Sequence, residues 1–97
     1  GDVYKRQPVE VAPLAPRDLI IDGESEPVEF TTETYHVALY EGASYSWTVP
    51  SGGTITEGAG TFAITVEWGA AGATGNITVS ASGVTVNPDS YPIEVVP

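Results

Sequence analysis

Apolar and polar residues alternate along most of this chain, and the alternation constrains its fold more than any other feature. Residues 62–68 read FAITVEW, with an apolar side chain at every second position. The same pattern recurs at 35–39, 45–49, 77–81 and 91–95. A period of two places one set of side chains on one face of a β-strand, so that the strand is half buried and half in water. We find no helical period.

Turn-forming residues separate these segments. Glycine supplies positive φ angles and proline fixes φ near the value that many turns need. Such residues cluster at Gly23, Glu41-Gly42, Pro50–Gly53, Gly58–Gly60, Gly69–Gly75 and Asn87–Ser90. About seven or eight short strands, with turns about every eight to twelve residues, predict an all-β antiparallel sandwich, with a barrel as the alternative.

The apolar positions of the strands are expected to form the core of one small domain. We place Tyr45, Trp47, Ile64, Val66, Trp68, Ile77 and Val79 at its centre. Further predicted core residues are Val28, Phe30, Tyr35, Val37, Leu39, Val49, Ile55, Phe62, Ile93 and Val95. Tyr40 is the only aromatic residue that we expect near the surface. Because Trp47 and Trp68 share faces with valine and isoleucine, packing is favoured over sugar stacking.

Residues 45–79, YSWTVPSGGTITEGAGTFAITVEWGAAGATGNITV, carry a resemblance to a known family. They resemble the bacterial form of the polycystic-kidney-disease-type (PKD-like) domain, which shows Tyr-x-Trp, Val-Pro-x-Gly-Gly, Ile-x-x-Gly-x-Gly-Thr, Ile-Thr-Val-x-Trp and Gly-x-Ile-x-Val in this order. The resemblance is weaker at 24–44 and 82–97. It implies an immunoglobulin-like β-sandwich over residues 19–97, no enzyme activity, and a spacer or adhesive role in large secreted surface proteins.

The two ends of the chain carry nearly the same phrase. Residues 8–13 read PVEVAP and residues 92–97 read PIEVVP, a period of 84 positions (92 − 8). Self-similarity at a fixed period indicates tandem modules. We therefore predict that 8–18 is the last strand of a preceding repeat followed by a proline-rich linker. The alternative is a chance match, which would make 8–12 the first strand of this domain.

Residues 2–7, DVYKRQ, resemble the translated transposon end that is used to prepare sequencing libraries. We expect residues 1–7 to be a non-native scar from environmental sequencing, and we exclude them from the fold argument. The alternative is an ordinary basic tail.

The charge of the chain excludes several classes of partner. The formal net charge is −10, with three basic residues and no cysteine. Such a chain repels nucleic acid and anionic membranes. No apolar run approaches the roughly 18 residues of a membrane span. We expect no nucleic-acid partner, no membrane insertion, and an extracellular or cell-surface location.

The chemistry of the side chains predicts no enzyme. His36 is the only histidine, and histidine catalysis needs a nucleophile and an orienting partner. We identify no catalytic and no cofactor-binding residue. The acids Asp22, Glu24 and Glu26 are weak calcium candidates, since calcium takes roughly six to eight oxygen ligands. A solvated acidic surface is the favoured interpretation, and no cofactor is expected.

These observations predict a non-catalytic spacer or interaction module of a secreted or cell-surface multidomain protein. Its expected partners are neighbouring domains of the same chain. The alternative is an adhesive module that binds a glycan, calcium or an extracellular protein.

Overall fold

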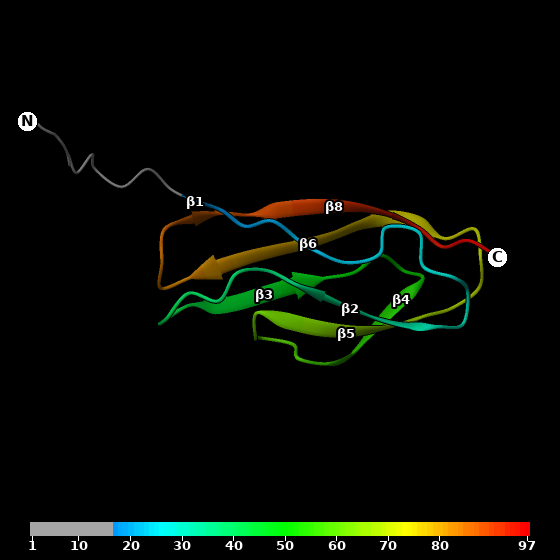
Figure 1. Cartoon of the computed structure of the whole chain (residues 1–97), viewed down its shortest axis with the longest axis horizontal. Coiled ribbons are helices and arrows are strands. Elements are labelled where there is room, and N and C mark those ends of the chain that lie inside the picture. The colour runs from blue at the N-terminus through cyan, green and yellow to red at the C-terminus, as the bar shows by residue number, and fades with distance from the viewer. Residues whose placement is uncertain (1–16) are drawn as a thin grey trace, which may run out of the picture.

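The structure of the protein, a computed structural model, describes residues 17–97. Within these residues the secondary structure consists of β-strands, with no helix. The strands are β1 (Arg17–Asp18), β2 (Thr32–His36), β3 (Ser44–Thr48), β4 (Gly53–Glu57), β5 (Ala63–Trp68), β6 (Thr74–Ser82), β7 (Val86–Asn87) and β8 (Asp89–Glu94). One antiparallel sheet has the order β2-β5-β4 and the other β3-β6-β8, while β1 pairs in parallel with β7. The two sheets form separate layers (Figure 1). The predicted antiparallel sandwich is therefore confirmed, and the barrel alternative is wrong.

The inward-facing side chains of both sheets meet in one core. Trp47 lies opposite Val79 in the β3–β6 pair, and Tyr35 lies opposite Ile64 in the β2–β5 pair. The rings of Tyr35 and Trp68 meet edge to face, with centroids 6.2 Å apart and planes at 84°. Such aromatic pairs stabilise a fold by about 0.5–1.5 kcal/mol beyond the area they bury. All seven residues placed at the centre of the core from the sequence are buried.

The core prediction was wrong at four positions, all beyond the ends of paired strands. Phe30 is 71% exposed, Leu39 67%, Val28 48% and Phe62 37%. Leu39 and Phe62 continue the alternation predicted at 35–39 and 62–68, but β2 ends at His36 and β5 begins at Ala63, while Val28 and Phe30 precede β2. Outside the regular ladders of the two sheets, the period of two no longer decides which way a side chain faces.

Other positions differ from the prediction in a smaller way. Leu19 and Ile21 are buried although neither was predicted to be in the core, whereas Val49 and Ile55 are only partly buried. Tyr40 is half-buried, and its backbone N–H donates to the Tyr45 hydroxyl at 2.8 Å. Since Phe30 and Phe62 are exposed, the prediction that Tyr40 is the only surface aromatic was wrong.

The turn before β5 depends on glycine. Gly58 has a φ of 86°, which L side chains rarely adopt, and a Cβ there would collide with the carbonyl oxygen of Ala63. Thr61 closes the turn, because its backbone N–H and its hydroxyl both donate to the Gly58 carbonyl, at 2.9 and 2.7 Å. The sequence pattern Gly-x-Gly-Thr therefore encodes this turn.

The described chain enters the sandwich at one end and leaves it at the other (Figure 1). We call the end where β1 and β7 lie the entry end; it also holds the turns 37–43, 58–62 and 83–85. We call the opposite end the exit end; it holds 28–31, 49–52, 69–73 and 95–97. A tensile force applied to the chain at its two ends would therefore act along the length of the sandwich.

Candidate functional site

One segment, residues 17–29, connects the two sheets, and we call it the strap. It runs parallel to the C-terminal segment, residues 86–96, at both ends of the sandwich. At the entry end, Arg17 pairs with Val86 in the parallel pair β1–β7. At the exit end, Val28 forms a parallel bridge with Val96. The strap thus follows the C-terminal segment over the length of the sandwich (Figure 1).

Backbone hydrogen bonds hold the strap to the C-terminal segment at intervals. Near the entry end, Leu19 N–H donates to the Asn87 carbonyl at 3.0 Å. Towards the exit end, Glu94 N–H donates to Ser25 at 3.0 Å and Glu29 N–H donates to Val96 at 2.7 Å. The strap therefore protects β8, which would otherwise be an open sheet edge.

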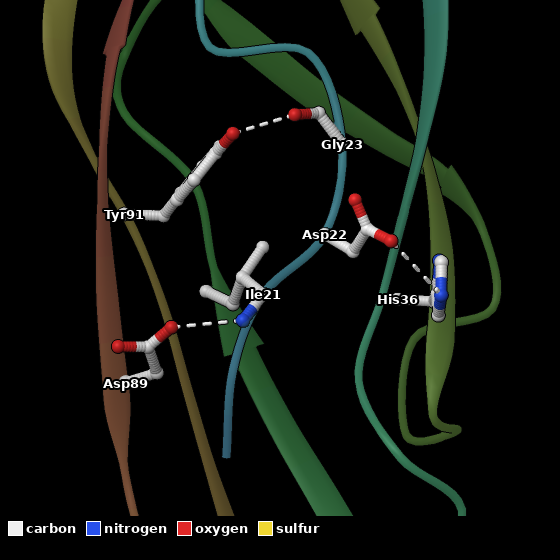
Figure 2. Close-up of polar contacts among 6 residues, drawn as sticks. All are labelled: Ile21, Asp22, Gly23, His36, Asp89 and Tyr91. Carbon is white, nitrogen blue, oxygen red and sulfur yellow. Dashed lines mark hydrogen bonds and ion pairs between the residues drawn. The ribbon is translucent and has the colours of Figure 1, made fainter. Parts of the chain in front are cut away.

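Side chains of β8 make the contacts between these backbone bonds. Asp89 Oδ2 accepts a hydrogen bond from the Ile21 N–H at 2.8 Å, and the Tyr91 hydroxyl donates to the Gly23 carbonyl at 2.5 Å. Figure 2 shows both contacts reaching from β8 to the strap. A carboxylate that accepts from a backbone N–H makes a stronger hydrogen bond than a neutral acceptor does.

The other side of the strap binds β2, which belongs to the opposite sheet. Asp22 and His36 exchange two backbone hydrogen bonds of 2.9 and 3.1 Å, and their side chains approach to 3.7 Å (Figure 2). The Tyr35 hydroxyl donates to the Glu24 carbonyl at 2.6 Å. Burial raises the pKa of Tyr35 to about 12. The strap therefore joins β8 of one sheet to β2 of the other.

We expect Asp89→Ala to lower the free energy of unfolding by roughly 1–3 kcal/mol, because it leaves the Ile21 N–H without its acceptor. Asp89→Asn is the matched control: it keeps a side-chain oxygen and should lose less. Urea denaturation of the three proteins measures both effects. Equal losses in the two variants would contradict a role for this hydrogen bond.

The acidic residues proposed from the sequence as weak calcium ligands do not come together. Asp22, Glu24 and Glu26 are all exposed. Glu24 Oε2 accepts a hydrogen bond from the Glu26 N–H at 3.1 Å, whereas the Asp22 carboxylate faces His36. Within residues 17–97, no group of three or more His, Cys, Asp or Glu side chains is arranged to hold a metal ion.

The two contacts of the strap that involve β8 side chains were not found from the sequence. Asp89 had been placed only in a turn and Tyr91 only on a strand, and each lies 68 positions from its partner. The only local signal was the Asn-Pro-Asp sequence at 87–89, which marks a turn but does not identify a long-range acceptor. The side chain of His36 is 51% exposed, and the acidic side chain that it approaches within the described chain is Asp22.

Two facing antiparallel sheets, with an N-terminal strap that contacts both, define an immunoglobulin-like β-sandwich. Within this class the chain belongs to the PKD-like domain family, whose model matches residues 14–95. No curated protein and no solved structure matches the chain.

Membership of this family supports two general statements about function. PKD-like domains are non-catalytic immunoglobulin-like modules in general, and they are typically extracellular. In the part of the chain that the structure describes, we find no helix with the length and hydropathy needed to cross a membrane.

Proposed function

We propose that this domain is a non-catalytic spacer that carries tension between neighbouring domains of a secreted or cell-surface multidomain protein. The observation that supports this proposal is the parallel course of the strap and the C-terminal segment, with the described chain entering at one end of the sandwich and leaving at the other.

Tension on the two chain ends would pull the strap towards the entry end and the C-terminal segment towards the exit end. The two segments would then slide along each other, so that the contacts from Leu19–Asn87 to Glu29–Val96 are loaded at the same time. If both attachment points lay at the same end of the sandwich, the force would break the same contacts one after another. Because forced unfolding depends on the unfolding rate under load, simultaneous loading should give the larger unfolding force.

Single-molecule pulling tests this proposal. The sequence contains no cysteine, so engineered cysteines give unique attachment points. One variant carries cysteines at the two ends, Gly1→Cys and Pro97→Cys, and the other carries Gly1→Cys and Thr85→Cys. We expect the unfolding force to be several-fold higher in the first variant. Thr85 is exposed and lies at the entry end beside β7, so the second geometry peels the strap from the sandwich.

The two geometries use the same fold and differ only in the direction of loading. An end-to-end force equal to or below the peeling force would overturn the proposal that the domain carries tension. The predicted preceding copy at residues 8–12 lies outside the described residues and stays a prediction. The adhesive alternative also stays a prediction; Trp47 and Trp68 are buried, and Asp22, Glu24 and Glu26 belong to no group within residues 17–97 that is arranged to hold a metal ion.

A further inference from the structure

The exposed large apolar side chains lie towards the two ends of the sandwich. Among residues 18–97 they are Ile20, Val28, Phe30, Leu39 and Phe62. Val28 and Phe30 belong to the exit end, Leu39 and Phe62 belong to the entry end, and Ile20 lies on the strap two residues beyond β1. Two exposed apolar side chains therefore lie towards each end, where a domain joined through a short linker would meet them.

The sides of the sandwich are polar by comparison. The outward-facing residues of β2 are Thr32, Thr34 and His36. Those of β3 are Ser44, Ser46 and Thr48. Association through the sides would therefore bury little apolar surface, whereas association through the ends would bury the exposed apolar side chains.

Phe30 is held at the exit end in an unfavourable conformation. Its φ is 60°, in the left-handed region, and it is the only non-glycine residue with a positive φ in the described chain. Its backbone N–H donates to the Gly69 carbonyl at 3.0 Å, which fixes the backbone while the ring stays 71% exposed. Bulky residues rarely adopt this region, and such strain often marks a functional position.

The chain also leaves the domain beside Phe30. Glu29, the neighbour of Phe30, donates its backbone N–H to the Val96 carbonyl at 2.7 Å. Pro97 follows Val96 directly, so the chain leaves the domain close to Phe30. Any domain that follows through a short linker is therefore held close to this end.

The repeat in the sequence gives the length of that linker. If PIEVVP of one copy corresponds to PVEVAP before the next, only Leu14, Ala15 and Pro16 separate Pro97 from Arg17 of the following copy. Four peptide units span at most about 14 Å. The entry end of the following copy would therefore lie next to the exit end of the preceding one, at an effective concentration on the order of millimolar.

We propose that successive copies of this domain dock head to tail, with Val28 and Phe30 of one copy against Leu39 and Phe62 of the next. This proposal rests on the proposed spacer function. The contact joins two different surfaces, and such contacts extend into linear arrays rather than closed rings when the rotation between copies does not close. The net charge of −10 repels separate chains, so docking depends on the covalent link.

The test uses residues 1–97 followed directly by a second copy of residues 14–97. Nuclear magnetic resonance relaxation should show both copies tumbling as one rigid body. Because the copies are identical, most amide signals should coincide, and those near Phe30 and near Leu39 and Phe62 should split into docked and free forms. Added sodium chloride should strengthen docking, since it screens repulsion beyond about 8 Å at physiological ionic strength.

Substitutions in one copy at a time give matched controls. Phe30→Asn in the first copy and Leu39→Ser in the second change the facing surfaces and should each restore independent tumbling. Asn tolerates the left-handed conformation, so Phe30→Asn should not unfold the domain. The same substitutions in the opposite copies change only the free ends, and they should leave docking intact while reporting any effect on folding.

Three results would overturn head-to-tail docking: independent tumbling of the unmodified copies, docking that survives both facing substitutions, or docking that weakens as salt is added. None of these results bears on the tension-carrying function, because the pulling measurement uses a single copy. Failure of one proposal is therefore distinguishable from failure of the other.

Discussion

Trp68→Ala should lower the free energy of unfolding by about 3–5 kcal/mol, because it removes the largest fully buried side chain of the domain. The indole is 1% exposed, meets Tyr35 edge to face, and occupies the space beside Gly53. Small domains are stable by only about 5–15 kcal/mol, so this loss would leave the fold marginal. Urea denaturation followed by far-ultraviolet circular dichroism measures the change.

Trp47 provides the comparison. It is 8% exposed, and its indole N–H donates to the Thr61 carbonyl at 2.7 Å, whereas the indole N–H of Trp68 has no hydrogen-bond partner among residues 17–97. Trp68→Phe therefore removes no hydrogen bond and should cost clearly less than Trp68→Ala. A Trp68→Ala protein with an unchanged denaturation midpoint would show that the indole does not belong to the core.

Stability should fall by roughly 2 kcal/mol between pH 10 and pH 12, as Tyr35 begins to ionise in the unfolded chain. Burial raises the pKa of Tyr35 in the folded state from 10.0 to about 12. Its contribution is therefore fully present below pH 10 and is lost as the pH rises towards 12. Urea midpoints measured at several pH values across this window give the slope.

Tyr35→Phe is the control for this prediction. It cannot ionise, so its stability should depend less on pH over the same window. It also loses the hydrogen bond to the Glu24 carbonyl, which lowers its stability at every pH without changing the slope. A Tyr35→Phe protein with the full decline would mean that other groups cause the loss of stability.

The sequence predicted the parts of the fold that depend on local pattern. Alternation along β3, β5 and β6 identified the strands and their buried faces, because pairing in a regular ladder keeps every second side chain on the same face. The pattern failed outside the regular ladders, at Phe30 and Leu39, since a residue beyond the end of a strand is no longer bound to that period.

The strap could not be predicted in the same way. Its acids and its proline at position 27 gave no strand pattern, and its partners lie far away in the sequence. Leu19 and Ile21 are buried because the strap packs against a C-terminal segment that only the folded chain brings near. Contacts of this kind depend on tertiary structure rather than on propensity.

The pairing of the strap with the C-terminal segment has a consequence for how the domain is made. Gly23 and Tyr91 are 68 positions apart, so a chain that emerges N-terminus first exposes the strap long before its partner is available. Contacts of such large sequence separation form slowly. Closure of the sandwich should therefore wait for the last residues of the domain to leave the ribosome. In an array of identical copies, a strap that is waiting in this way can also pair with the C-terminal segment of a neighbour, so the order of synthesis helps to keep each strap with its own domain.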